Sequence, residues 1–261
     1  MTTGMEDLDD LWLRLSVAKN SLLIFDYEGT LTGPSVGTSV PEPLPWVTER
    51  IESILTGGSK VGIIANHSVD EVTEVLRFAW EVDLWGLHGS ELRKQEETIL
   101  QFVLSTEIKA GFKHAIDRIK IAGWQSHLIR KHGVLIISWI GLPRLEASKM
   151  QESVPKLLKP VLRNEEFVLV EHTNKYELTI RNLDKSSAVA SMILDSDRDA
   201  VIAYFGDDES DIDAFRMLNG TGDSFLVNPK KLRTPADHHL TSSDELSIFL
   251  EKWNSVIHGI F

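Results

Sequence analysis

Short apolar runs and amphipathic stretches alternate along the first hundred residues. Ser21–Phe25 and Lys60–Ile64 are mostly apolar, and polar residues follow each of them directly. Such runs are typical of strands buried in a parallel sheet, with a polar loop at the carboxyl end of each strand. Glu6–Lys19 and Trp46–Leu55 have the apolar spacing of amphipathic helices. The alternation predicts an α/β domain with a doubly wound parallel sheet.

A capping-box pattern marks the start of the next helix. Ser68 is followed three residues later by Glu71, a pair that satisfies N–H groups at the beginning of a helix. The sequence therefore predicts a helix from Ser68 to about Phe78, and then a third short strand at Leu84–Leu87. The Pro- and Gly-rich stretch Gly33–Pro45 is expected to be a loop.

The pattern changes between about residues 105 and 180, where apolar runs come in pairs. Short turns such as His132-Gly133 and Thr173-Asn174 separate the members of each pair, which is typical of antiparallel hairpins. We expect helix, strand, strand, helix, strand and strand over Glu107–Ala122, Gln125–Lys131, Val134–Trp139, Leu145–Leu162, Phe167–Glu171 and Tyr176–Ile180. The sequence thus predicts an α+β domain at residues 105–182, inserted into a core at 20–104 and 183–261.

The α/β alternation returns after the predicted insertion. The expected elements are a helix, a strand, a helix, a strand and a helix, at Lys185–Leu194, Ala200–Phe205, Ile212–Leu218, Ser224–Val227 and Asp244–Trp253. Ser242 provides the capping residue for the last helix. The segment therefore completes the same sheet that the first hundred residues begin.

Composition and charge narrow the classes of function. The net charge of −12 excludes a general nucleic-acid binder, whose binding surface is basic. The absence of cysteine excludes disulfides and zinc sites built from thiolates. No apolar run approaches the roughly 20 residues that span a membrane, and the acidic segment Met1–Asp10 lacks the basic start of a secretory signal. We expect a cytoplasmic protein without nucleic-acid or membrane partners.

Two acidic clusters follow predicted strands. Asp26–Leu31 comes directly after Ser21–Phe25, and Gly206–Asp211 comes directly after Ala200–Phe205. In an open parallel sheet, ligands bind at the carboxyl ends of the strands. Carboxylates gathered there repel one another unless a cation lies among them, and Mg²⁺ prefers such oxygen ligands. The alternative is that these acidic loops only cap helices and face solvent.

Three phrases resemble the signature of the haloacid dehalogenase superfamily. Asp26–Leu31 resembles the motif DxDGTL, Lys185 resembles the lysine of the third motif, and Gly206–Asp211 fits GDxxxD. Within the superfamily the chain is most similar to trehalose-6-phosphate phosphatases. Gly86–Arg93 and Gly206–Phe215 are similar to that family's phrases HGAEIR and GDDxTDEDAF. The predicted insertion lies where this family has its α+β cap domain.

The resemblance implies a reaction through an aspartyl-phosphate. Asp26 would be the nucleophile, and Lys185 would hold both Asp26 and the phosphate. Asp26 and Asp207 would bind Mg²⁺ through their side chains and Glu28 through its backbone carbonyl, with Asp211 supporting the metal or its waters. The candidate phosphate- or substrate-binding residues are Asn66, His88, Glu91, Lys131, Glu177 and Asp208.

The chain departs from the family at two positions near the expected nucleophile. Glu28 replaces the second aspartate of the motif, which protonates the leaving oxygen and then activates water. Its carboxylate is one methylene farther out, and general acid catalysis depends on placement within hydrogen-bond reach. Ala65 replaces a serine or threonine that binds phosphate, so Asn66 or the backbone N–H groups of this segment would have to supply that hydrogen bond.

The cap domain departs further, and this widens the range of substrates. Of the family's ExK and GKxxE phrases, only Lys131 and Glu177 remain. The sequence therefore favours a phosphorylated sugar over trehalose 6-phosphate in particular. The leading hypothesis is a Mg²⁺-dependent sugar-phosphate phosphatase. The alternative is a catalytically weakened relative that binds a phosphosugar or a partner protein for regulation.

Overall fold

The protein is described by a computed structural model, which covers residues 8–33, 39–78, 81–94, 97–100, 103–181 and 183–259. The chain divides into two compact units. One unit, called the core unit below, comprises Met1–Ile99 and Asp184–Phe261. The other, called the inserted unit, comprises Leu100–Leu183, where the sequence suggested an insertion at residues 105–182. Within the described ranges no helix is long and apolar enough to cross a membrane.

The core unit is organised around an eight-stranded sheet with the order β12-β11-β10-β1-β2-β3-β4-β5. Every pairing from β12 to β3 is parallel, and β3 pairs with β4 in the antiparallel direction. The strands are β1 (Ser21–Asp26), β2 (Lys60–Ile64), β3 (Asp83–Gly86), β4 (Glu91–Lys94), β5 (Glu97–Leu100), β10 (Val201–Gly206), β11 (Asp223–Val227) and β12 (His238–Leu240).

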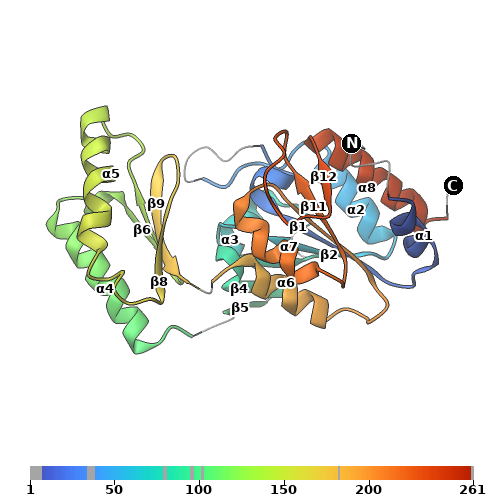
Figure 1. The fold of residues 1–261 in the computed structure, drawn as a ribbon, viewed down its shortest axis with the longest axis horizontal. Coiled ribbons are helices and arrows are strands. Elements are labelled where there is room, and N and C mark those ends of the chain that lie inside the picture. Colours follow the sequence, from blue (N-terminus) through green and yellow to red (C-terminus); the bar gives the residue numbers. More distant parts are fainter. Residues whose placement is uncertain are drawn as a thin grey trace. The chain divides into compact units, whose positions relative to one another are not determined.

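Helices cover both faces of this sheet, as expected for a doubly wound fold. Leu23 and Phe25 of β1 belong to the cluster formed with α1 (Asp9–Val17), α2 (Val47–Thr56), α3 (Val69–Val75) and α8 (Ser243–Ile257). Leu22 and Ile24 point to the opposite face, toward α6 (Lys185–Leu194) and α7 (Ile212–Leu218). Figure 1 shows α6 and α7 together on one side of the strands and α1, α2 and α8 together on the other. The central strands are therefore buried on both sides, which explains their continuous apolar runs.

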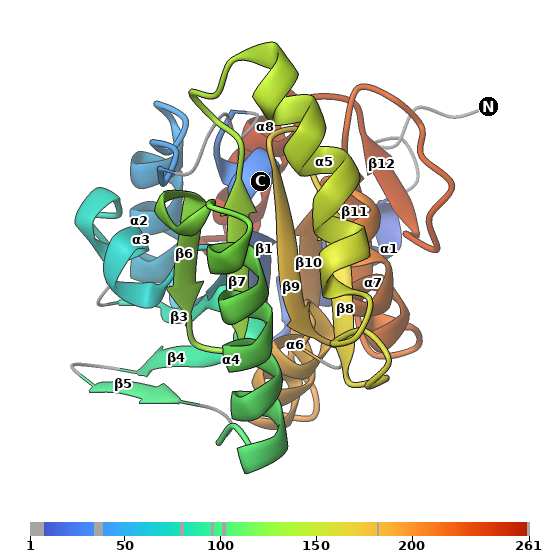
Figure 2. The ribbon, with the colours of Figure 1, turned by 90° about the vertical axis from the view of Figure 1, so that its left-hand side faces the viewer.

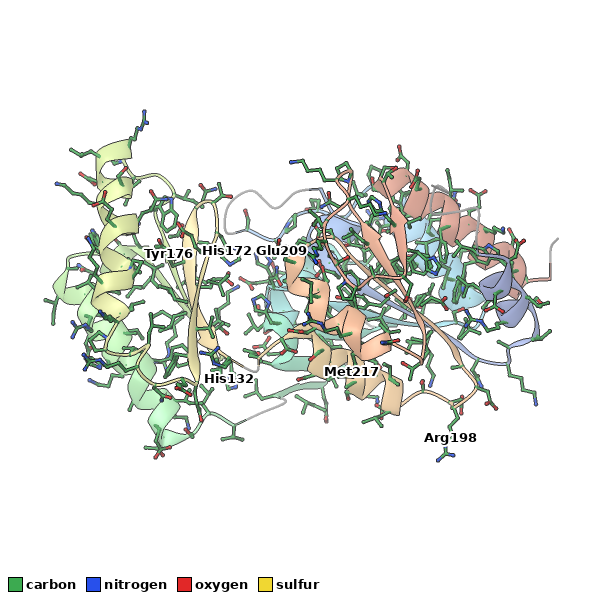
Figure 3. The ribbon with its side chains drawn as sticks, viewed as in Figure 1. His132, His172, Tyr176, Arg198, Glu209 and Met217 are labelled. Carbon is green, nitrogen blue, oxygen red and sulfur yellow. The ribbon has the colours of Figure 1, made fainter. Side chains whose placement is uncertain are left out.

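The inserted unit is a four-stranded antiparallel sheet with two helices. Its strands have the order β6-β7-β9-β8, and their bounds are Leu128–Lys131, Val134–Ser138, Lys175–Ile180 and Phe167–Glu171 respectively. The helices α4 (Thr106–Ile121) and α5 (Arg144–Leu158) pack on one face of this sheet (Figure 2). Figure 3 shows Tyr176 on the face that meets the helices and His172 on the opposite face.

Three short strands were not expected from the sequence. These are β4, β5 and β12, which lie toward the edges of the core sheet. β4 has the sequence Glu-Leu-Arg-Lys and β12 contains only three residues, His-His-Leu. β5 and β12 are the edge strands and β4 is next to the edge. Strands at a sheet edge commonly carry charged and polar residues that suppress pairing with other chains, so they lack the apolar pattern of buried strands.

Several predicted elements end or begin at different residues in the structure, and the helix predicted as Asp244–Trp253, for example, extends to Ile257. The helix predicted as Leu145–Leu162 ends at Leu158, because Pro160 has no backbone N–H to donate to the preceding turn. The predicted helix to Phe78 ends at Val75, since Leu76 is extended and buried. Gln125–His127 is a 3₁₀ turn rather than the start of β6.

Candidate functional site

The site is centred on Asp26, the last residue of β1. Its carboxylate is almost fully buried, and Nζ of Lys185 lies 2.7 Å from its Oδ1. Lys185 is the first residue of α6, and the same Nζ lies 2.8 Å from Oδ1 of Asp211. Burial alone would lower the pKa of Lys185, but the carboxylates of Asp211 and Asp26 outweigh it and the pKa is raised. A buried, charged ammonium therefore joins two carboxylates.

Asp211 is held by four donors. Its Oδ1 accepts from Lys185 Nζ at 2.8 Å and from the Tyr204 hydroxyl at 2.6 Å. Its Oδ2 accepts from the backbone N–H groups of Asp207 and Asp208 at 3.0 and 3.2 Å. A Cβ at Gly206 would lie 2.3 Å from Cγ of Asp211, so only glycine leaves room for this carboxylate. Asp211 thus fixes both the lysine and the loop that follows β10.

Asp207 completes a cluster of carboxylates. Oxygen atoms of Asp26, Asp207 and Asp211 all lie within 4.8 Å of one another. Burial, with the neighbouring carboxylates, raises the pKa of Asp26 well above its usual value despite the opposing effect of Lys185. Burial and then the charges of Asp208 and Asp211 raise the pKa of Asp207 to about 7. This excess of negative charge, presented by oxygen ligands, fits a hard divalent cation such as Mg²⁺.

A glycine allows Asp207 to approach β1. Gly29 lies in the turn Tyr27–Leu31 after Asp26 and has a φ of +91°. A Cβ at this position would lie 2.2 Å from Oδ2 of Asp207. Both the backbone conformation and the close approach therefore require glycine. The Asn228 side chain also donates to the Asp207 carbonyl at 2.8 Å, which fixes the loop from the β11 side.

Glu28 points toward the end of β2. The residue is 7% exposed, and its Oε2 accepts from the backbone N–H of Asn66 at 2.9 Å. Its Oε1 accepts from the backbone N–H of His67 at 3.3 Å and lies 2.6 Å from Nδ1 of the same residue. Burial raises the pKa of Glu28, but the hydrogen bond and charge of His67, with the Asn66 N–H, outweigh it and the pKa is lowered. The carboxylate is therefore ionised and tied to the β2–α3 loop.

The segment that follows β3 supports this loop. The N–H of Leu87 donates to the His67 carbonyl at 2.9 Å, and the N–H of His88 donates to the Ala65 carbonyl at 3.1 Å. His88 has a φ of +57°, which turns the chain toward the loop. Glu91, on β4, accepts from the first N–H of α3 at 3.1 Å. His88 and Glu91 thus hold the β2–α3 loop in place.

The remaining candidates are distributed over both units. Asp208 is exposed and caps the turn after β10 by accepting from Ser210 N–H. Lys131 and Glu177 lie on one face of the sheet of the inserted unit, opposite the helices, as the strand register requires. Glu177 is buried there, with Lys175 Nζ at 2.6 Å. The core unit therefore brings together Asp26, Glu28, Asn66, Lys185, Asp207, Asp208 and Asp211.

Four residues that contact the candidate site residues were not identified from the sequence. His67 contacts Glu28, Tyr204 and Asn228 bind the Asp207–Asp211 loop, and Lys175 pairs with Glu177. Three of the four had a weak signal in the sequence. His67 follows a predicted strand, and Tyr204 is the one polar-tipped side chain in the apolar run of β10. Lys175 is two residues from Glu177, which places both on one face of a strand.

Comparison with known proteins identifies solved structures that have the same fold as this chain. No protein-family model and no curated protein sequence matches the chain. Among solved structures, trehalose-6-phosphate phosphatase from Aspergillus fumigatus (crystal form 3) is 20% identical over 97% of this chain and 99% of that chain, with a TM-score of 0.67. The C-terminal domain of the C. albicans trehalose-6-phosphate phosphatase is 17% identical over 100% and 99%, with a TM-score of 0.74.

A third similar structure belongs to a regulatory protein. The C-terminal domain of the Candida albicans trehalose synthase regulatory protein is 7% identical over 94% of this chain and 97% of that chain, with a TM-score of 0.63. Together with the site, these similarities define the class: the chain has the fold of haloacid dehalogenase-type phosphatases, with an inserted α+β cap domain. Within that class, it resembles trehalose-6-phosphate phosphatases in structure.

The first prediction concerns Gly29. We expect Gly29→Ala to destabilise the protein by at least about 2 kcal/mol, because the new Cβ requires a strained backbone and displaces Asp207. Gly33→Ala is the matched control, since nothing lies within 4 Å of a Cβ at Gly33. Urea unfolding of both variants measures the difference. Equal stability of the two variants would contradict the close approach of Gly29 and Asp207.

The second prediction concerns the raised pKa of Asp207, about 7 against an ordinary value of 3.8. Between these values the folded protein holds a proton that the unfolded chain has lost, so this group lowers stability as pH rises from about 4 to 7. Asp207→Asn removes this contribution, which is at most about 1.4 kcal/mol per pH unit. Urea unfolding with EDTA across this pH range measures the slope. The same slope in both proteins would show that Asp207 titrates normally.

Proposed function

We propose that the chain is a Mg²⁺-dependent phosphatase that hydrolyses the phosphate ester of a phosphorylated sugar. The observation that carries this proposal is the buried Lys185 ammonium between Asp26 and Asp211, with Asp207 beside them. This arrangement combines a carboxylate nucleophile with a fixed positive charge at the carboxyl ends of parallel strands. The fold shared with trehalose-6-phosphate phosphatases supports a sugar phosphate as substrate, and trehalose 6-phosphate is the first to test.

The reaction divides into two steps. A carboxylate oxygen of Asp26 attacks phosphorus, the bond from phosphorus to the sugar oxygen breaks, and the leaving oxygen takes a proton from Glu28, which must first leave Asn66 and His67 and gain that proton from water. Water then attacks the aspartyl-phosphate, giving a proton to Glu28 and releasing inorganic phosphate and the Asp26 carboxylate. Lys185 stabilises negative charge on the phosphoryl oxygens in both steps.

The carboxylates of Asp26 and Asp207 and the backbone carbonyl of Glu28 would hold Mg²⁺, supported by Asp211. The metal would supply further positive charge to the phosphoryl oxygens. The crowding of negative charge that raises the pKa of Asp26 and Asp207 supports this assignment. Asp211 contributes mainly through Lys185 and the loop, since its oxygens already accept four hydrogen bonds.

The metal assignment predicts a loss of binding in two variants. Asp26→Ala and Asp207→Ala are each expected to weaken Mg²⁺ binding at least about tenfold, because each removes an oxygen ligand. Asp213→Ala is the control, since its carboxylate is exposed and pairs with Arg216. Isothermal titration calorimetry with Mg²⁺ measures the affinities. Unchanged affinity in both test variants, with normal thermal unfolding, would mean that the cluster is not a metal site.

The activity itself is tested by measuring phosphate release from a panel of sugar phosphates, with and without Mg²⁺. We expect release from at least one phosphosugar that requires Mg²⁺ and falls by at least about a thousandfold in Asp26→Asn, which removes the nucleophile. Asp213→Asn is expected to retain the activity of the unaltered protein. Full activity of Asp26→Asn would exclude the aspartyl-phosphate route.

A regulatory role is the second candidate, and the position of Glu28 favours it. Its carboxylate is bound by Asn66 and His67 and is ionised, so it is not poised as a proton donor. The similarity to the C-terminal domain of a trehalose synthase regulatory protein is consistent with this role. Calorimetric binding of a phosphosugar without turnover of any member of the panel would favour regulation over catalysis.

A further inference from the structure

An anion already lies on the backbone N–H groups that follow β2. The N–H groups of Asn66 and His67 are consecutive donors, and both point at the Glu28 carboxylate, at 2.9 and 3.3 Å. Consecutive N–H groups that converge in this way form an anion-binding concavity. The imidazole of His67, 2.6 Å from Oε1, provides a third contact to the same anion. The loop is therefore an anion site whose occupant belongs to the protein itself.

This anion site lies next to the nucleophile. β2 pairs with β1, and the register places Ile64, the last residue of β2, beside Asp26. Asn66 and His67 follow Ile64 by two and three residues, at the same carboxyl edge of the sheet. Ala65 provides no hydroxyl, and the backbone N–H groups of Asn66 and His67 are donors with which this loop already binds an anion.

We propose that the N–H groups of Asn66 and His67 form the binding site for the substrate's phosphoryl group. The Glu28 carboxylate occupies this phosphoryl site until the substrate displaces it. Glu28 is then a built-in competitor for the phosphate, held in place by His67. The inference rests on the proposed function, because the displacing group is the phosphoryl group of the substrate. It assigns the phosphate contacts to two backbone N–H groups and gives Glu28 a second role besides proton transfer.

The backbone around Glu28 restricts how the carboxylate can leave. The buried Tyr27 donates its hydroxyl to the Pro41 carbonyl at 2.6 Å, and the N–H of Gly29 donates to Thr32 Oγ1 at 3.0 Å. These contacts fix the turn on both sides of Glu28. Displacement therefore occurs by rotation of the Glu28 side chain about its own torsions. The rotation that frees the two N–H groups also separates Glu28 from His67, so phosphate binding and release of the acid are one event.

The length of the Glu28 side chain makes the proposal testable. An aspartate at this position keeps the negative charge, but its carboxylate is about 1.5 Å closer to the backbone. It cannot reach N–H groups that Glu28 contacts at 2.9 and 3.3 Å. Glu28→Asp therefore frees the phosphoryl site without changing its net charge. The variant thus separates direct competition between carboxylate and phosphate from electrostatic repulsion between them.

The experiment is calorimetric titration with inorganic phosphate at saturating Mg²⁺. We expect Glu28→Asp to bind phosphate about tenfold more tightly than the unaltered protein, since the phosphate no longer displaces charge-assisted hydrogen bonds. Glu209→Gln is the control: it removes an exposed carboxylate in the turn after β10 but frees neither N–H group, and its gain should be at most about twofold. Affinity in Glu28→Asp that is equal to or weaker than that of the unaltered protein would overturn the proposal.

Two further results keep the test decisive. If Glu28→Asp loses cooperative thermal unfolding, Glu28→Gln takes its place, because a neutral amide oxygen holds the two N–H groups less strongly. Its gain in phosphate affinity must then exceed that of Glu209→Gln, and a smaller gain would overturn the proposal. Tighter phosphate binding without turnover of any phosphosugar would support this phosphoryl site while contradicting the phosphatase activity. Failure of this proposal and failure of the proposed function are therefore distinguishable.

Discussion

The ammonium group of Lys185 is the interaction on which the rest of the site depends. Removing a lysine and several carboxylates from water is costly, and their mutual attraction offsets this cost only when the geometry is good and further hydrogen bonds are made. Here the lysine contacts Asp26 and Asp211, and Asp211 is satisfied by three more donors. This one contact ties the end of β1, the start of α6 and the loop after β10 into a single arrangement.

Two glycines allow the carboxylates to come so close. Gly206 leaves room for Asp211 and Gly29 leaves room for Asp207. Without these close approaches, the oxygens of the three aspartates would be farther apart than the 4.8 Å within which they lie. The site thus combines strong like-charge repulsion with backbone geometry that prevents its relief by separation. Such stored repulsion is what a cation, or a proton shared among the carboxylates, relieves.

Much of the fold was predictable because buried strands and capped helices have strong local signals. The apolar run before Asp26, the capping box at Ser68 and the helix at Lys185–Leu194 all have the predicted type and position. The short edge strands lack such signals, because their pairing depends on a neighbouring strand. The direction of Glu28 was not predictable either. Its contact with His67 joins residues 39 positions apart, so it depends on how β1 and β2 pair.

The order of strands in the core sheet has a consequence for the protein as it is synthesised. β1 lies between β2 and β10, yet β2 ends at Ile64 and β10 begins only at Val201. While the chain emerges from the ribosome, β1 has one unpaired edge until the whole inserted unit and β10 have been made. An exposed apolar edge is a template for pairing with other chains, and long-range pairing is slow. Nascent chains of this protein therefore expose this edge of β1 until β10, in about the last quarter of the sequence, has been made.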